Sequence, residues 1–427
     1  MRDADVFITG MGIVSPAGRD ADTSWSALLA GKRCIGPACI RDGNGRAHWC
    51  AGRVVDTPSP PNTASMDRVS LLAVAAADEA VASADLDPER LKTDDGHGVG
   101  VSIGTSKGSI LALTQLVSAT AGMTQFNTLG AGRQEVSPPW DALAPDAPAR
   151  AIARRYQTRG ATHCTVAACA TGVLAVIRAA DWIREGACQL ALAGSTDAAL
   201  APLWFGAFER MGVLAAPHPR LGPAWACRPF DRSRQGFAIG EGAAILVLES
   251  DQSVRQRKAI ALARLAGWAV GTDPTGLTRS ADDGRLLARL IQRACQTTGV
   301  RPTDLTAIHA HGTATSTNDL LETRALGSVM GSRIGEVPIV SIKGAVGHLL
   351  GAAGAVELAI ATKSCAQRVI PGNATLLDAD PAMTDLRLPR AAEAIEPGPI
   401  LKTSLGFGGH QAAVVIAPTE TTGSGRP

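Results

Sequence analysis

The stretch Val166-Ala-Ala-Cys-Ala-Thr-Gly-Val-Leu-Ala-Val-Ile-Arg-Ala-Ala-Asp-Trp-Ile183 predicts a strand, a turn and a helix in direct succession, with Cys169 at the bend. Small residues surround the cysteine, and the helix that follows is rich in Ala, Val, Leu and Ile. Strands that alternate with buried helices are typical of α/β proteins. The stretch therefore predicts an α/β fold that presents a cysteine where a strand gives way to a helix.

Strand and helix patterns alternate on both sides of this stretch. In the first part of the chain we expect a strand from Val6, a helix over 66–84, and strands over 98–104, 190–194 and 243–249. The polar stretch 252–258 resembles a junction between two series of elements. The second series comprises strands over 259–270, 307–310, 338–341 and 412–417 and helices over 284–298 and 351–366.

The alternation predicts α/β layers built on largely parallel sheets. The two series resemble a duplicated unit, so we expect an N-terminal half over 1–251 and a C-terminal half over 252–418. The polar residues 419–427 are expected to form a disordered tail.

The composition excludes several classes of function. With a net charge of +2 and only 4% aromatic residues, the 427-residue chain lacks the basic surface and stacking platforms of nucleic-acid-binding proteins. The longest apolar stretch, 345–361, contains His348 and Glu357 and does not read as a membrane span. No signal peptide precedes the first strand, and the nine cysteines include no CxxC pair. We therefore expect a soluble protein of the cytoplasm, without a zinc ribbon or a disulfide framework.

Cys169 is the first candidate for chemistry. A cysteine at a helix N-terminus gains from the helix dipole and from unpaired N–H groups, which favour the thiolate. The same N–H groups can hold a tetrahedral oxyanion. The alternative is a cysteine packed in the core, where a thiol behaves as a small hydrophobic group. Cys164 competes for the role, but it lies earlier in the strand and is expected to be structural.

Three histidines form the second group of candidates. His309 and His311 are two apart on an expected strand, which would place both imidazoles on one face. Together with His348 they allow a three-histidine zinc site. Two features argue against zinc: small hydroxyl residues follow His311, and Lys343 lies five residues before His348, where its ammonium would repel a bound cation.

The stretch Gly406-Phe-Gly-Gly409 completes the set. Glycines on both sides of one aromatic residue allow backbone with positive φ, so Phe407 can gate a cavity. A phosphate-binding loop is less well supported, because no GxxxxGK[ST] motif occurs.

Taken in order, Cys169, His311, Lys343, His348 and Phe407 resemble the β-ketoacyl-acyl carrier protein synthases, specifically the elongating type with a Cys-His-His triad. The resemblance runs from Val6-Phe-Ile-Thr-Gly-Met-Gly-Ile-Val-Ser-Pro16 to the Phe407 stretch, and includes Arg228-Pro-Phe-Asp-Arg-Ser-Arg-Gln-Gly-Phe-Ala-Ile-Gly-Glu-Gly242. It implies the thiolase fold, in which two similar halves form five αβαβα layers, usually in a homodimer.

The resemblance also implies a role for each of these residues. Cys169 would accept the acyl group, and the backbone N–H groups of Cys169 and Phe407 would form the oxyanion hole. His311 and His348 would stabilise the enolate that remains when a malonyl thioester loses CO2. That enolate would attack the acyl group on Cys169, extending the chain by two carbons, while Phe407 gates access.

Supporting roles follow from the same resemblance. Lys343, paired with Glu357, would fix the orientation and protonation of the histidines. Thr313 and Thr315 would bind the amides of pantetheine. The residues expected to bind the substrate are Thr313, Thr315, Glu357, Gly408 and Lys107. No resident cofactor or metal is implied, because phosphopantetheine arrives on the acyl carrier protein.

The chain departs from the family pattern at three places. The segment 56–65 lacks the basic residues that often dock acidic carrier proteins, which leaves Arg68 and Arg210 as docking candidates. Lys107 lies in a loop where relatives often place a small or apolar residue near the acyl pocket. If it points inward it would disfavour a plain alkyl chain, and the alternative is a solvated lysine. His410-Gln411 stands where relatives more often have Thr-Asn or His-Asn.

The resemblance predicts an elongating ketosynthase of fatty acid or type II polyketide synthesis. A thiolase or a priming synthase is the rival with the same fold, but priming enzymes usually carry asparagine in place of the second histidine. A chain-length-factor partner, which does not condense, is the non-enzymatic rival, and Cys169 argues against it. The chain could also be the catalytic half of such a heterodimer. The expected partners are therefore acyl carrier protein, malonyl and acyl thioesters, and a second ketosynthase-like subunit.

Overall fold

The computed structural model describes residues 5–42, 45–61, 63, 66–92, 98–114, 140–278 and 283–419. The expected tail over 419–427 lies outside this part of the chain except for its first residue. Among the described residues, no helix is both long enough and apolar enough to cross a membrane.

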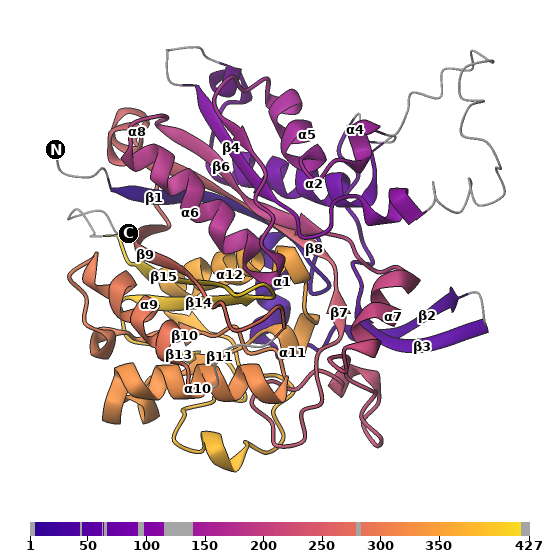
Figure 1. Ribbon diagram of the computed structural model, residues 1–427. Coiled ribbons are helices and arrows are strands. Elements are labelled where there is room, and N and C mark those ends of the chain that lie inside the picture. Colours follow the sequence, from indigo (N-terminus) through magenta and orange to yellow (C-terminus); the bar gives the residue numbers. More distant parts are fainter. Residues whose placement is uncertain are drawn as a thin grey trace, which may run out of the picture.

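Ten strands form one mixed sheet that consists of two equivalent halves (Figure 1). The N-terminal half has the order β1 (Val6–Val14), β8 (Gly242–Ser250), β6 (Leu190–Asp197), β4 (Val99–Gly104), β5 (Thr162–His163). The C-terminal half repeats it as β9 (Ala263–Thr272), β15 (His410–Ala417), β14 (Ile400–Gly406), β10 (Ala307–His309), β11 (Ile339–Val340). A short antiparallel pairing of β1 with β9 joins the halves.

The strand directions also repeat. In each half the pairings between the first and second strands and between the second and third are antiparallel. The pairings between the third and fourth strands and between the fourth and fifth are parallel. The expectation of largely parallel sheets is therefore wrong, because hydrophobic periodicity reports burial and carries no information on strand direction. The duplication expected from the sequence is confirmed by the identical order and direction of the two sets of five strands.

Helices complete the layers on both sides of each half. The central layer consists of α6 (Thr171–Arg184) and α12 (Ala353–Gln367), which pack against each other and against strands of both halves. One outer layer contains α2 (Arg68–Ser83) and α5 (Ala147–Tyr156), and the other contains α9 (Arg285–Gln296) and α10 (Ser316–Met330). Figure 1 shows the outer pairs at opposite ends of the molecule, which is the predicted αβαβα arrangement.

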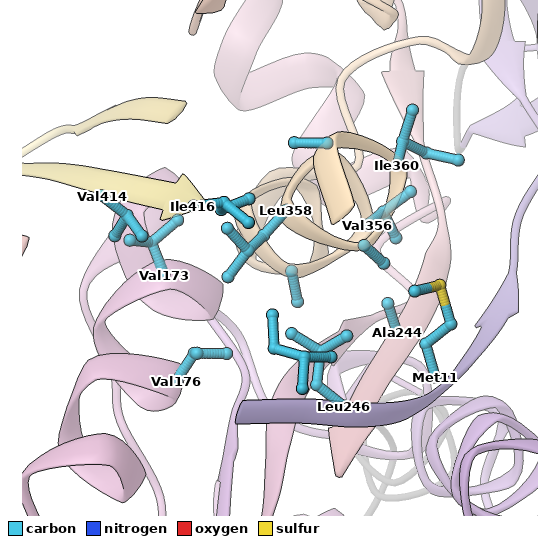
Figure 2. Packing of buried hydrophobic residues seen from close by; sticks show 14 of the residues in the cluster. Met11, Val173, Val176, Ala244, Leu246, Val356, Leu358, Ile360, Val414 and Ile416 are labelled. Atoms are coloured by element: carbon cyan, nitrogen blue, oxygen red, sulfur yellow. The ribbon is translucent and has the colours of Figure 1, made fainter. Parts of the chain in front are cut away.

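The largest hydrophobic cluster surrounds the two central helices. Figure 2 shows side chains of α6, α12, β1, β8 and β15 meeting there, among them Val176, Val356, Leu358 and Leu246. Almost every residue of α12 is buried, so this helix is apolar on nearly all sides rather than along one stripe. By contrast, α9 on the outside buries one face and exposes the other.

The N-terminal ends of the central helices lie unusually close together. A Cβ built on Gly172 would lie 2.4 Å from the backbone N of Ala355, and one built on Gly354 would lie 2.9 Å from the backbone N of Val173. Only glycine fits at such a backbone approach. The two glycines thus bring together the turns that precede the two helices, and the chemically reactive residues lie on those turns.

The remaining elements connect or cover these layers. They are α1 (Ala21–Leu29), β2 (Ile35–Asp42), β3 (Gly45–Gly52), α4 (Trp140–Leu143), α7 (Pro202–Arg210), β7 (Ile239–Gly240), α8 (Asp251–Arg257), α11 (Lys343–Val346), β12 (Val369–Ile370) and β13 (Glu393–Ala394). The polar junction expected over 252–258 is mostly the helix α8, which Ser250 caps by accepting the N–H of Ser253.

Candidate active site

Cys169 lies on a one-turn 3-10 segment, Ala168–Ala170, immediately before α6. Ala168 has a φ of +47°, a conformation that an L side chain adopts only at a cost of about 1–2 kcal/mol. Two contacts hold the turn: Thr171 Oγ1 accepts the N–H of Ala167 at 2.9 Å, and Ser404 Oγ donates to the Cys169 carbonyl at 3.3 Å. The strand expected to begin at Val166 is absent, because β5 ends at His163 and Val166 is 56% exposed.

Burial raises the pKa of the Cys169 thiol to about 11. The positive charges of Lys107 and Lys343 act in the opposite direction but do not overcome the loss of solvation. Burial thus opposes the thiolate, whereas the helix N-terminus was expected to favour it. The sulfur is a neutral thiol, which needs an adjacent proton acceptor or a substrate to become nucleophilic.

His348 is the side chain next to this sulfur, and its tautomer makes it a donor rather than an acceptor. Its Nε2 lies 3.1 Å from Cys169 Sγ, and its Nδ1 lies 3.2 Å from the backbone N of Leu350. A backbone N–H can only donate, so Nδ1 accepts and the ring proton resides on Nε2. The imidazole therefore presents an N–H donor at the position of the sulfur.

His311 has the same tautomer for a different reason. Lys343 Nζ lies 3.4 Å from His311 Nδ1 and 2.5 Å from the His311 carbonyl oxygen. An ammonium has no acceptor, so Nδ1 again accepts and Nε2 carries the proton. The rings of His311 and His348 meet edge to face, with centroids 5.6 Å apart.

Both imidazoles are neutral. Burial lowers the pKa of His311 and of His348 well below the usual 6.5, and the positive charge of Lys343 adds to the effect at each ring. Two neutral rings that each present Nε2–H form a pair of hydrogen-bond donors suited to one developing negative oxygen.

His309 does not join this pair. β10 ends at His309, and the ring Nε2 of this residue lies 3.1 Å from Ser364 Oγ on α12. His311 lies beyond the end of β10, and the ring of His309 contacts Ser364 and does not line the cavity. Within the residues that the structure describes, no group of three or more His, Cys, Asp or Glu is placed to hold a metal ion.

A buried carboxylate links two lysines behind the histidines. Glu357 Oε1 lies 2.5 Å from Lys343 Nζ, as expected from the sequence, and Glu357 Oε2 lies 2.8 Å from Lys402 Nζ. All three side chains are almost fully buried. Glu357 contacts the lysines rather than the cavity, so its place among the residues expected to contact substrate is corrected to support of Lys343.

A cavity of about 130 Å³ opens onto the sulfur and the two imidazoles. Thr313 and Thr315 line it, with their hydroxyl oxygens 2.9 Å apart. Phe407 also lines it, whereas Gly408 does not and instead donates its N–H to the Leu277 carbonyl at 2.7 Å. The lining residues are Cys169, Val213, Phe237, Leu277, Thr278, His311, Thr313, Thr315, Thr317, Asn318, Leu321, His348, Leu405, Gly406, Phe407 and Gly409.

Phe407 follows β14, whose end packs against the cysteine turn. A Cβ built on Gly406 would lie 3.2 Å from the backbone N of Cys169, so the backbones of the two segments are in close contact. Gly408 and Gly409 both have a φ of +85°, as expected for backbone next to a gating aromatic residue. His410 follows on β15, where it is half-buried.

The two arginines expected at a docking surface differ in their surroundings. Arg68 donates to both carboxylate oxygens of Glu241, at 2.6 and 2.7 Å, and to the Val54 carbonyl, and its side chain is 27% exposed. This arginine therefore fixes the start of α2. Arg210 ends α7 and is exposed.

Cys164 and Lys107 complete the predicted set. Cys164 lies after β5, and its Sγ is 3.2 Å from the Pro145 carbonyl, away from the residues that line the cavity. Lys107 is half-buried, and its Nζ lies 4.5 Å from the centroid of the Trp204 ring. It is thus not a freely solvated lysine.

Two acidic residues of α10 were missed by the sequence analysis. Glu322 accepts the N–H groups of His311 and Gly312 at 2.7 and 2.8 Å, and Asp319 accepts the N–H of Thr313 at 2.9 Å. They are three apart on one helix face that directly follows the Thr313–Thr315 loop, and this spacing is the signal that would have identified them. Asp197, at the end of β6, was missed as well; it accepts the Gly351 N–H at 2.8 Å.

Comparison with known proteins identifies relatives over the whole chain. Residues 3–253 match the family model of the β-ketoacyl synthase N-terminal domain, and residues 262–376 match that of the C-terminal domain. A 3-oxoacyl-[acyl-carrier-protein] synthase 2 of Synechocystis sp. is 31% identical over 417 residues, which cover 96% of this chain and 97% of the relative.

Two solved structures are similar over nearly their entire length. One is a type II polyketide synthase ketosynthase in complex with its acyl carrier protein and bound to a hexaketide, with a TM-score of 0.87, 28% identity and coverage of 98% of this chain and 100% of that one. The other is the ishigamide ketosynthase/chain length factor, with a TM-score of 0.83, 27% identity and the same coverage.

Proposed function

Since the chain belongs to the β-ketoacyl synthase family, with its thiolase-like fold, and is an elongating acyltransferase, we propose that Cys169, His311 and His348 carry out its decarboxylative condensation. The observation that carries this assignment is the shared tautomer of the two histidines. Both rings are neutral and present Nε2–H, because Leu350 N–H and Lys343 occupy their Nδ1 atoms.

The first half-reaction loads the enzyme. The sulfur of Cys169 attacks the thioester carbonyl of an acyl-acyl carrier protein, forming a new S–C bond. The pantetheine thiol leaves with the proton that Cys169 gives up. The proton goes to the departing pantetheine sulfur, because the neighbouring His348 ring already carries a proton on Nε2 and cannot accept it there.

The second half-reaction extends the chain. The thioester carbonyl of malonyl-acyl carrier protein accepts hydrogen bonds from His311 and His348, and the bond to the carboxylate breaks to release CO2. The electron pair of that bond becomes the enolate, which these two N–H groups stabilise. Its carbon attacks the acyl carbonyl on Cys169 and forms the new C–C bond. The S–C bond then breaks to release a 3-ketoacyl-acyl carrier protein, and the expelled sulfur takes up a proton from water to restore the thiol.

Other residues prepare the site for these steps. The backbone N–H groups of Cys169 and Phe407 hold the tetrahedral oxyanion, which is consistent with the close approach of β14 to the cysteine turn. Thr313 and Thr315 bind the pantetheine amides from the cavity wall. Phosphopantetheine arrives on the carrier protein, and we propose no resident cofactor.

Partners follow from the same assignment. Acyl carrier protein docks near the mouth of the cavity, with Arg210 as a basic contact. A second ketosynthase-like subunit, identical or homologous, covers the sheet edge at β5, where Thr162, His163 and Val166 are exposed. The solved ketosynthase/chain length factor supports the heterodimeric alternative, in which this chain supplies the catalytic cysteine.

Eight free cysteines among the described residues support a reducing, cytoplasmic location.

The test combines mass spectrometry with product analysis. The purified protein is incubated with acyl-acyl carrier protein and then with malonyl-acyl carrier protein labelled with 13C. We expect an acyl group on the Cys169 peptide, and a labelled 3-ketoacyl product after the second addition. Cys164→Ala should behave as wild type, since its sulfur lies outside the cavity. An acyl group on another residue would refute the assignment of the nucleophile.

A further inference from the structure

The loop that carries Lys107 is fixed against both reacting segments. Thr105 donates its N–H to the Thr165 carbonyl at 3.2 Å, in the segment that leads to Cys169. On the other side, a Cβ built on Gly351 would lie 2.6 Å from the backbone N of Ser106, so the loop also packs against the turn that follows His348. Lys107 is thus held close to the reacting sulfur by backbone contacts.

The side chain of Lys107 lies among aromatic rings. Its Nζ is 4.5 Å from the ring centroid of Trp204 and 5.7 Å from that of Phe208, both on α7. Phe208 meets Phe237 at 5.5 Å between centroids, and Phe237 meets His348 at 4.9 Å. The rings of Phe208 and Phe237 therefore connect the ammonium to the imidazole of His348.

The ammonium is incompletely bonded. Within the part of the chain that the structure describes, Nζ makes one hydrogen bond, to Ser106 Oγ at 3.0 Å. Ser106 in turn donates to Asp197, so the hydroxyl stands between the lysine and this buried carboxylate. An ammonium has three donors, so two are not taken by any residue that the structure describes.

The charge of Lys107 acts directly on the reacting residues. It lowers the pKa of Cys169 against the larger effect of burial, and it contributes to the lowered pKa of His348. Lys107 is not among the residues that line the cavity with Thr313 and Thr315. Its charge thus acts on the sulfur from outside the set of residues that line the cavity.

The first carbons of an acyl group on Cys169 are bonded to the sulfur on which the charge of Lys107 acts, so they lie in the field of the same charge. A plain alkyl chain there would strip water from the charge without replacing the lost hydrogen bonds. A chain with carbonyl oxygens would accept the free N–H donors, and hydrogen bonds to a charged donor are among the strongest in proteins.

We propose that Lys107 is a specificity-determining residue that selects acyl chains bearing oxygen acceptors, such as 3-oxoacyl groups, over plain alkyl chains. This inference rests on the proposed function, because it concerns the acyl group that Cys169 accepts. The rings of Trp204 and Phe208 confine the ammonium, so that it meets the acyl chain at a defined place.

The test compares two acyl donors of equal length, the hexanoyl and 3-oxohexanoyl thioesters of pantetheine. Their rates of transfer to Cys169 are measured by intact-protein mass spectrometry in wild type, Lys107→Met and Lys107→Gln. We expect the ratio of the 3-oxohexanoyl to the hexanoyl rate to fall about tenfold or more in Lys107→Met, the factor that one hydrogen bond to a charged donor supplies. Comparing ratios between variants removes the intrinsic difference in reactivity of the two thioesters.

Lys107→Gln and a control variant, Lys92→Met, make the outcome decisive. Lys107→Gln retains N–H donors without the charge and should give an intermediate ratio, which a change in folding alone would not produce. Lys92→Met alters a lysine paired with Glu89 in another part of the chain and should leave the ratio unchanged. An unchanged ratio in both Lys107 variants overturns this inference alone. If neither donor acylates Cys169 in wild type, the proposed function fails, and this inference fails with it.

Discussion

His348 Nε2 lies 3.1 Å from Cys169 Sγ, and the two residues occupy equivalent places, each on the turn that precedes a central helix. Cys169 precedes α6 in the N-terminal half, and His348 precedes α12 in the C-terminal half. The duplication of the fold thus supplies the nucleophile from one half and its imidazole from the other. The geometry of the site depends on how closely those two helices pack.

Enlarging a glycine between the central helices should therefore damage the protein. In Gly172→Ala the new methyl group would lie 2.4 Å from the backbone N of Ala355 and from Ser195 Oγ. We expect a loss of about 1–3 kcal/mol in the free energy of unfolding, measured by urea denaturation, with slower acylation of Cys169. Gly206→Ala on α7 is the matched control, since a Cβ there meets nothing within 4 Å and should be neutral or slightly stabilising. Equal effects of the two variants would contradict this account.

Glu357 should be essential for stability because it neutralises two buried lysines. Glu357→Gln leaves Lys343 and Lys402 without their carboxylate, and both side chains are 0% exposed. Removing one member of a buried ion pair costs about 3–5 kcal/mol. Glu336→Gln, which breaks the exposed pair with Arg333, should cost less than about 1 kcal/mol. Urea unfolding curves of the two variants measure both changes, and a similar small loss in each would show that the buried network contributes little.

Malonyl decarboxylation should not change between pH 8 and about pH 6. The pKa values of His311 and His348 are held well below 6.5 by burial and by the charge of Lys343, so both rings stay neutral as the pH falls through 6.5. CO2 release from malonyl-acyl carrier protein, followed across this range, tests the point. An inflection near pH 6.5 would mean that one of the two rings titrates normally.

The buried histidines should make folding sensitive to acid. Burial lowers the pKa of His309 to about 3, whereas the unfolded chain binds this proton near pH 6.5. The unfolded state therefore holds more protons below pH 6.5, and the free energy of unfolding falls as the pH drops, by about 1.4 kcal/mol per pH unit for one such group. His309→Gln should unfold with a slope that is smaller by this amount between pH 6 and 5. Parallel slopes in variant and wild type would argue that His309 titrates alike in both states.

The sequence predicted those parts of the site that depend on residue type and order. The small-residue setting of Cys169 and the position of His348 before an apolar helix were enough to place both on turns that precede buried helices. The pairing of Lys343 with Glu357 followed from the resemblance to the family and is present in the structure. The duplicated organisation was visible as two series of similar elements.

Other features could not be read from the sequence because they depend on tertiary contacts. The antiparallel direction of β8 and β15 leaves no trace in hydrophobic periodicity. Glu322 and Asp319 look like residues of a solvated helix face until the His311–Thr315 loop is seen to donate its N–H groups to them. Burial raises the pKa of Cys169, and the extent of that burial is set by segments far away in the sequence.

Condensation requires Cys169, whereas His311 and His348 suffice for the decarboxylation of the malonyl group. The most direct measurement is the simultaneous recording of CO2 release and 3-ketoacyl product in Cys169→Ala with malonyl- and acyl-acyl carrier proteins. CO2 release should continue in this variant while no 3-ketoacyl product forms. Condensation by Cys169→Ala, or the loss of both activities in a variant that remains folded, would contradict these roles.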